Sequence, residues 1–285
     1  MPVFTDPPSH QDMKISAIII GDELLSGKRQ DKHLAALVRI LAARGQRLAG
    51  VEYLGDDPER LTATFRRALA SGEVVFSFGG IGATPDDHTR RCAAQALGVE
   101  LVLHPEAKAL IRERMRDVAR EQGVPYEPDR SDNVHRLNMG MFPVGARIIP
   151  NPYNKIAGFS CTSPQVPGGC VHFVPGFPVM AWPMIEWVLQ HYYAQHFHQA
   201  PQLEQSVIVY QGLESTLTPL MERLEAQHPG IKVFSLPSVN HPEHGWHIEL
   251  GVKGAATLVP AAWEELLQGL QALGAQLGPQ MQRQR

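Results

Sequence analysis

From residue 15 onward, short runs of β-branched and aromatic residues alternate with runs that place apolar residues at helical spacing. The first strand-like run, ISAIII at 15–20, is followed by a helical pattern at 33–44 and a second apolar run at 47–54. Asp57 and Pro58 then open a helix as N-cap and first-turn proline, and a third strand, EVVFSF, follows at 73–78. Because this alternation is typical of βαβ units, the sequence predicts an α/β fold with a doubly wound, mostly parallel sheet.

The chain changes character near residue 200. Before it, a charged helical pattern at 106–122 leads into a Pro- and Gly-rich stretch at 143–178, which predicts strands joined by tight turns, and then into a closing helix at 182–197. Beyond it, a strand, a helix, two strands and a helix ending at 277 predict a second, smaller α+β domain. We therefore expect a disordered lead at 1–13, an α/β domain at 14–199 and the α+β domain at 200–285.

Charge and composition exclude several classes of protein. The 285 residues carry 26 Lys and Arg against 29 Asp and Glu, so no long-range positive field favours a nucleic-acid partner. The most apolar long stretch, at 173–189, contains three prolines and is too short for a membrane span, so no membrane partner is expected. Three cysteines without a CxxC pair indicate free thiols and a cytoplasmic location.

Acidic residues follow each of the first three predicted strands. They are Asp22 and Glu23 after the first, Asp56 after the second, and Asp86 and Asp87 after the third. Because ligands of doubly wound sheets bind at the carboxyl ends of the strands, we expect these carboxylates to converge on one crevice.

A glycine loop after the third strand predicts a phosphate site. Gly79, Gly80 and Gly82 let backbone N–H groups approach an anion, and a helix predicted from about 87 to 97 adds positive potential behind them. Carboxylates beside a phosphate repel it unless a hard cation lies between them, so the pairing indicates Mg²⁺ or a similar ion. This interpretation assigns Asp22, Asp86 and Asp87 as metal ligands.

Simpler interpretations account for some of the same residues. Asp57 is explained as an N-cap, and Thr84 with Asp87 resembles a capping arrangement.

The segment 21–29 resembles a Walker loop but has five residues between its glycines and an Arg where Mg²⁺ needs a hydroxyl. The glycine loop lacks the third glycine of a dinucleotide fingerprint, which argues against a nicotinamide dehydrogenase.

Five motifs carry a family resemblance. GDELLSGKRQDKH, YLGDDPERL, FSFGGIGATPDDHTR, NPYNKIAGF and VPGFPVM occur in the order found in the molybdopterin-binding domain of the CinA-type competence/damage-inducible family. The tail, with GLESTLTPLMERLE, resembles the family's KH-like second domain. The resemblance implies a molybdopterin-like or nucleotide pyrophosphate ligand, and some members are similar to metal-dependent pyrophosphatases that split ADP-ribose or FAD, with Mg²⁺ or Co²⁺ and with K⁺ as a helper ion. The family's frequent third, deamidating domain is not expected in this chain.

The resemblance transfers site roles to matching positions. Asp22, Glu23 and Asp87 match as catalytic residues, and the residues matched as ligand contacts are Ser26, Asp31, Asp56, Gly79, Gly80, Gly82, Thr84 and Thr89. Asn154 and Lys155 depart from a family Gly-Thr pair, Ala83 and Ala157 from prolines, and Val179 from an acidic residue. Asn154 is expected to keep the turn in a left-handed conformation, and Lys155 to offer a positive contact to phosphate.

Three hypotheses of function follow. The first is a metal-dependent hydrolase of a nucleotide pyrophosphate, with His88 as a proton shuttle or a helix-surface residue. The second is a non-catalytic protein that binds molybdopterin or a related cofactor, and the third is an RNA-interacting tail. A small phosphorylated molecule is the expected ligand and a homodimer the expected assembly, with its interface in the apolar segment 173–187.

Two motifs of the tail have alternative interpretations. His241, His244 and His247 could bind Zn²⁺ or lie in a solvated hairpin between two strands. Gly251 to Gly254 mimics the GXXG of an RNA-binding KH domain, but it follows a predicted strand, whereas that loop must join two helices.

Overall fold

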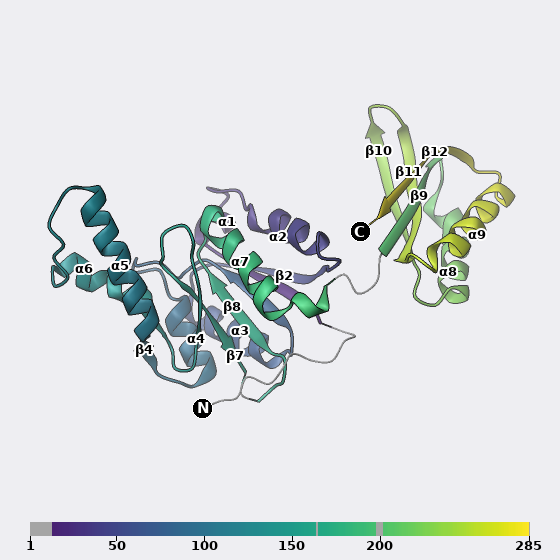
Figure 1. Cartoon of the computed structure of the whole chain (residues 1–285). Helices are drawn as coiled ribbons and strands as arrows, with labels where there is room; N and C mark the ends of the chain where they lie inside the picture. Colours follow the sequence, from purple (N-terminus) through teal and green to yellow (C-terminus); the bar gives the residue numbers. More distant parts are fainter. Residues whose placement is uncertain (1–12, 164, 198–201, 285) are drawn as a thin grey trace. The chain divides into compact units, whose positions relative to one another are not determined.

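The computed structural model describes residues 13–163, 165–197 and 202–284, and these form two compact units (Figure 1). The first unit ends at His196, and the second is built from the chain beyond it. The lead expected at 1–13 lies, apart from Met13, outside the described residues.

The first unit alternates strands and helices along the chain. Its strands are β1 (Ile15–Ile20), β2 (Leu48–Leu54), β3 (Val74–Phe78), β4 (Leu101–Leu103), β5 (Met141–Pro143), β6 (Arg147–Ile149), β7 (Gly158–Thr162) and β8 (Cys170–Val174). Its helices are α1 (Asp22–Leu25), α2 (His33–Ala42), α3 (Pro58–Ala70), α4 (Thr89–Leu97), α5 (Pro105–Glu121), α6 (Ser131–Arg136) and α7 (Pro178–Tyr192), with short 3-10 turns η1 (Leu137–Gly140) and η2 (Ala194–His196).

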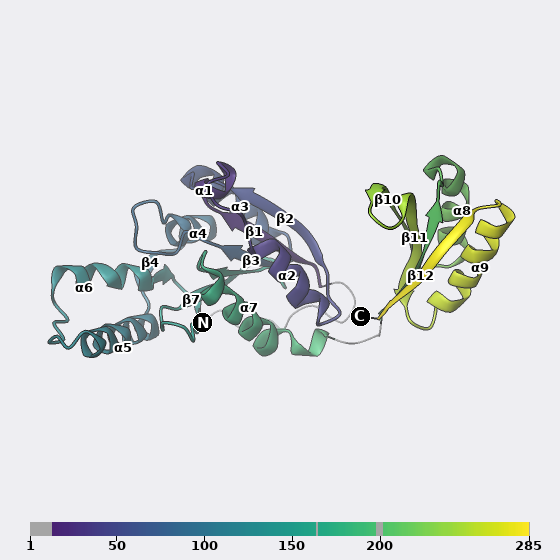
Figure 2. The same cartoon turned by 90° about the horizontal axis from the view of Figure 1, so that it is seen from above.

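Six of these strands form one sheet in the order β2-β1-β3-β8-β7-β6. The first four are mutually parallel, whereas β7 runs antiparallel to β8 and β6 antiparallel to β7. Helices α2 and α7 cover one face and α3 and α4 the other (Figure 2). Every residue of β3 is buried, as expected for a strand covered on both faces. The predicted doubly wound, mostly parallel sheet is confirmed.

The direction of β6 determines which loops meet. Two reversals of direction, at β7 and again at β6, make β6 parallel to β8, so its carboxyl end lies at the same edge of the sheet as those of β1, β2, β3 and β8. We call this the carboxyl edge. It brings together the loops that contain all five sequence motifs of the first unit.

Two predicted helices begin elsewhere in the structure. Helix α4 begins at Thr89, not Asp87, because the carboxylate of Asp87 is bonded back into the preceding loop. Helix α7 begins at Pro178 and not at residue 182, because a proline in the first turn needs no hydrogen-bond acceptor for its nitrogen. Helix α6 and the short β4–β5 pair were not predicted, since neither has a long periodic pattern.

The second unit is a four-stranded antiparallel sheet in the order β10-β11-β9-β12. Its elements are β9 (Gln202–Tyr210), α8 (Glu214–Gln227), β10 (Lys232–His241), β11 (Gly245–Ala255), α9 (Val259–Ala272) and β12 (Gln276–Gln284). Apolar residues of β9, β11, α8 and α9 form its core. The predicted smaller α+β domain is confirmed, but α9 ends five residues before the predicted 277 and the polar β12 was missed.

The GXXG of the tail lies inside β11 and joins no helices. Gly251 is required there by packing, because a Cβ at this position would lie 2.6 Å from the backbone carbonyl oxygen of Gln205. The loop needed to clamp an RNA backbone is therefore not formed by these residues.

The three cysteines are free and buried, as predicted. No helix in the described part of the chain is both long and apolar enough to cross a membrane. The apolar segment expected to supply a dimer interface is core only in part, because Phe173, Val174, Met184 and Ile185 are fully buried in the first unit, whereas Phe177 and Val179 are exposed. The buried residues cannot supply an interface, and the expected contact through the rest of the segment stays a prediction.

Candidate functional site

Backbone contacts tie the loops of the carboxyl edge together. The Gly21 N–H donates to the Leu54 carbonyl at 3.0 Å, which joins the loops after β1 and β2. The Gly79 N–H donates to the Val174 carbonyl at 3.0 Å, which joins the ends of β3 and β8. The glycine loop, defined here as residues 79–87, therefore begins between the ends of β1 and β8.

Glycine is required where this loop begins. Gly79 and Gly80 have φ values of 99° and 67°, and a Cβ on Gly79 would lie 2.6 Å from the Ile20 carbonyl oxygen. Thr89, which is fully buried, anchors the loop from α4: its hydroxyl donates to the Gly79 carbonyl and its N–H to the Gly80 carbonyl, both at 3.1 Å. Thr89 thus shapes the loop, while its own donors are already engaged.

Asp87 closes the loop on itself. Its Oδ1 accepts the Gly82 N–H at 2.8 Å, and its Oδ2 accepts the Thr84 N–H at 2.8 Å and the Thr84 hydroxyl at 2.5 Å. The prediction of Asp87 as a metal ligand is not supported by this geometry, because three hydrogen bonds already engage its carboxylate. The Thr84–Asp87 capping arrangement is present, but it stabilises the loop and not the first turn of α4.

Three N–H groups of the loop stay available. Within the described residues, those of Gly80, Ile81 and Ala83 donate to no acceptor, whereas those of Gly82 and Thr84 are bound by Asp87. Free N–H groups that converge ahead of a helix can bind phosphate oxygens.

Four acidic side chains lie at the same edge. Asp22 and Asp56 are bonded reciprocally: the Asp22 N–H donates to Asp56 Oδ2 at 3.0 Å and the Asp56 N–H to Asp22 Oδ1 at 3.2 Å. Burial raises the pKa of the Asp56 carboxyl, and the negative charges of Asp22, Glu23 and Asp86 raise it further, against the N–H of Asp22, which lowers it. The carboxylates after β1, β2 and β3 are therefore close enough to interact, as the topology predicts.

The acidic cluster offers the right kind of ligand atom for a hard cation, but too few of them to hold it alone. Carboxylate oxygens are the ligands that Mg²⁺ prefers, and Asp22 and Asp56 each keep one oxygen free of the reciprocal bonds. In the described ranges, however, no three His, Cys, Asp or Glu residues are arranged to hold a metal ion. A cation bound here would complete its coordination with phosphate oxygens and water, as Mg²⁺ often does.

Two further predicted contacts have local structural roles. Asp31 caps α2, because its carboxylate accepts the N–H groups of His33 at 2.8 Å and Leu34 at 3.0 Å. It also accepts the Tyr53 hydroxyl at 2.8 Å, and burial together with this bond raises the pKa of Tyr53 to about 12. Ser26 is exposed at the end of the four-residue helix α1.

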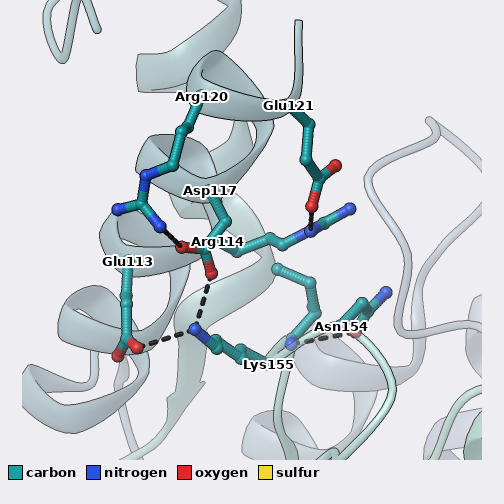
Figure 3. Close-up of polar contacts among 8 residues, drawn as sticks. Glu113, Arg114, Asp117, Arg120, Glu121, Asn154 and Lys155 are labelled. Carbon is teal, nitrogen blue, oxygen red and sulfur yellow. Dashed lines mark hydrogen bonds and ion pairs between the residues drawn. The ribbon is translucent and has the colours of Figure 1, made fainter.

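Lys155, which is predicted to contact phosphate, forms ion pairs with two carboxylates of the first unit. Its ammonium lies 2.7 Å from Glu113 Oε1 and 2.5 Å from Asp117 Oδ2, both on α5 (Figure 3). Lys155 also has the left-handed backbone, with φ 63°, that was expected at Asn154. The side chain of Asn154 makes two other contacts. Its Oδ1 accepts the Ile156 N–H at 3.0 Å, and its Nδ2 lies 3.3 Å from Met180 Sδ.

Two buried basic side chains bind carbonyl groups of the glycine loop and of the loop after β8. Arg90, buried in α4, donates to the carbonyls of Ile81 and Gly82, the latter at 2.6 Å, and burial lowers its pKa. His33 is bonded through Nε2 to the Gly176 carbonyl at 3.0 Å, and burial lowers its pKa despite that bond. Neither had a sequence signal, because both looked like ordinary helix residues.

The tail histidines do cluster on the β10–β11 hairpin. The ring centroids of His241, His244 and His247 lie 4.9 to 5.5 Å apart, and the Nδ1 of His244 lies 3.2 Å from the Tyr210 hydroxyl. Their nitrogens are not placed to hold a metal ion together, so the hairpin interpretation is favoured over a Zn²⁺ site.

The first unit matches a family model described as a probable molybdopterin binding domain, over residues 16–196. A protein of Pyrobaculum calidifontis is 30% identical over 220 residues, which cover 77% of this chain and 79% of that protein. A CinA-like protein of Desulfovibrio desulfuricans is 33% identical over 172 residues, which cover 60% of this chain and 37% of that longer protein.

A solved structure shows the same relationship. The crystal structure of CinA from Thermoplasma acidophilum, described there as of unknown function, superposes with a TM-score of 0.51 at 26% identity, covering 62% of this chain and 97% of that one. The region matched by the family model contains the glycine loop and the acidic cluster. The chain belongs to the CinA-type family, with its molybdopterin-binding domain in the first unit.

Proposed function

We propose that the carboxyl edge binds a phosphorylated, cofactor-type ligand, either a molybdopterin-like molecule or a nucleotide pyrophosphate such as ADP-ribose or FAD. The observation that carries the proposal is the set of free N–H groups at Gly80, Ile81 and Ala83 in a loop that leads into α4. Membership of the family of probable molybdopterin binding domains supports the cofactor-type ligand.

The acidic cluster favours a second step, hydrolysis of the pyrophosphate bond. Asp22, Glu23, Asp56 and Asp86 beside the glycine loop would repel a phosphate unless a cation lay between them. We propose that Mg²⁺ or Co²⁺ binds the carboxylate oxygens that Asp22 and Asp56 keep free, with the charge of Asp86 nearby, and completes its coordination with the phosphate and water, with K⁺ as an accessory ion. Such an ion supplies charge neutralisation and Lewis acidity for attack by water.

The residues of the chain would position the ligand and a proton. The glycine loop orients the phosphate, and Asp87 keeps that loop in shape. His88 precedes α4, and Arg91 donates to its Nδ1 at 3.1 Å, so Nε2 is the nitrogen that carries the proton of the neutral ring. We propose His88 as the group that moves a proton to or from the leaving phosphate.

The test incubates the pure chain with ADP-ribose or FAD, with and without Mg²⁺ or Co²⁺, and measures both binding by calorimetry and products by chromatography. Cleavage that needs the cation supports the hydrolase, and tight binding without cleavage supports the non-catalytic binder. No binding of either ligand would refute the site. Gly80→Ala is the matched loop variant, because its Cβ would collide with Thr89, and it should abolish binding.

A homodimer stays a prediction that rests on the family resemblance. Light scattering at several concentrations measures it, and a mass of 31.5 kDa throughout would contradict it.

A further inference from the structure

Two aromatic side chains at the carboxyl edge are more than half exposed. Phe177 is 57% exposed and Tyr153 is 63% exposed. Phe177 is the N-cap residue of α7 and makes no side-chain capping bond, although Ser, Thr, Asp or Asn there would stabilise the helix by about 1 kcal/mol. More than half of each side chain is thus open to contact by a ligand.

Phe177 lies beside the glycine loop. A Cβ placed on the preceding Gly176 would lie 3.5 Å from the Gly79 Cα. Since consecutive Cα atoms are about 3.8 Å apart, the Cα of Phe177 lies within roughly 9 Å of that of Gly79. The bond from His33 to the Gly176 carbonyl, at 3.0 Å, holds this loop in place.

Tyr153 belongs to the loop after β6, which reaches the same place. The contact between Asn154 and Met180 joins this loop to the first turn of α7, next to Phe177. The buried Asn151 fixes the loop by accepting the Tyr153 N–H at 3.0 Å and donating to the Ile156 carbonyl at 2.9 Å. Both aromatic residues are thus carried on bonded loops at the carboxyl edge.

We propose that Phe177 and Tyr153 bind the flat heteroaromatic ring of the ligand whose phosphate meets the glycine loop, an inference that rests on the proposed function. The separation of Phe177 from Gly79 suits a ligand in which a sugar or a short pyran-type linker joins phosphate to ring. Stacking depends on the face of the ring and not on its particular hydrogen-bond donors and acceptors. This surface therefore accepts purine, flavin and pterin rings alike. The ligand class is therefore a phosphate joined to a planar ring.

The test compares ligands with and without the ring. Binding of FAD, ADP-ribose and ribose 5-phosphate is measured by calorimetry for the wild type and for Phe177→Ala, Tyr153→Ala and Phe177→Tyr. Each Ala variant should weaken FAD binding at least about fivefold and change ribose 5-phosphate binding less than about twofold. Phe177→Tyr should bind FAD as the wild type does. Trp246→Ala, which removes an exposed aromatic residue of the second unit, is the matched control and should change nothing.

Several results would overturn the inference. Ala variants that lose FAD and ribose 5-phosphate equally would show that the loops had shifted, and Ala variants that bind FAD normally would show that the rings do not contact it. A wild type that binds ribose 5-phosphate as tightly as FAD would refute the ring contact and leave the phosphate site intact. A wild type that binds none of the three would refute the proposed function itself. An apparent mass that falls in Phe177→Ala would assign the pair to a contact between chains instead.

Discussion

Replacing Asp87 by Asn tests how the glycine loop keeps its shape. The carboxylate accepts bonds from the Gly82 N–H, the Thr84 N–H and the Thr84 hydroxyl. An amide has one oxygen, and its NH₂ group cannot accept. If the amide oxygen stays toward Thr84, the Gly82 N–H loses its acceptor and faces a second donor.

The magnitude follows from these bonds. A hydrogen bond to a charged group contributes about 1.5–3 kcal/mol, and the partial exposure of this loop reduces that value, so Asp87→Asn should lower the free energy of unfolding by about 1–2 kcal/mol. For a unit of this size the melting temperature should fall by roughly 2–8 °C. Binding of a phosphate ligand should weaken about tenfold, equally with and without Mg²⁺, because the shape of the loop is lost and not a metal ligand.

Asp86→Asn is the matched control, because it removes the same charge from the exposed neighbouring residue. It should change the stability of the free protein by less than about 0.5 kcal/mol and weaken binding only when Mg²⁺ is present. Thermal melts of the free protein and calorimetry with and without Mg²⁺ measure both variants. An Asp87→Asn protein with unchanged stability and a loss of binding confined to Mg²⁺ would make Asp87 a metal ligand and refute this reasoning.

Three further variants or conditions test the fold. Burial lowers the pKa of His172 from 6.5 to about 3. At pH values between these two, the His172 ring is therefore protonated in the unfolded chain but neutral in the folded chain. Urea titrations should then show stability falling as the pH drops below 6.5, by up to about 1.4 kcal/mol per pH unit, and falling less steeply in His172→Gln. Asp31→Ala should cost about 0.5–2 kcal/mol in the same titrations, because α2 loses its N-cap. Lys155→Gly should be about 1 kcal/mol more stable than Lys155→Ala, because both lose the ion pairs to α5 but only Ala keeps the strain of φ 63°.

The features that the sequence predicted correctly are local. The β1 strand could be predicted from six consecutive apolar or small residues. The N-cap of α3 could be predicted from Asp57 and the proline after it, and the Asp57 carboxylate accepts the N–H groups of Glu59 and Arg60 at 2.9 Å. The convergence of acidic loops followed from the parallel order of the strands, which local patterns also indicate.

The features that were missed depend on partners far along the chain or on loop geometry. Lys155 is held by Asp117, which lies 38 residues away, and no local pattern indicates that pairing. The role of Asp87 depends on a loop that turns back five residues to Gly82, where spacing alone suggested a helix cap. The exposure of Phe177 could not be predicted, because it lies in an apolar segment that also contains buried residues such as Phe173 and Val174.

The position of β12 affects how this protein can be handled. Its residues 276–284 are mostly polar, yet they pair with β9 from Leu203 to Tyr210. A recombinant chain cut after α9 would leave β9 as an open sheet edge, with a row of unpaired N–H and C=O groups that invites association between molecules. It would also remove Arg283, whose guanidinium lies 2.8 Å from Glu204 and 3.1 Å from Glu249, and leave two partly buried carboxylates facing each other. Purification tags and fusion partners therefore belong at the other terminus. Precipitation of a shortened chain would reflect the exposed edge of β9 and would not count as evidence against ligand binding by the first unit.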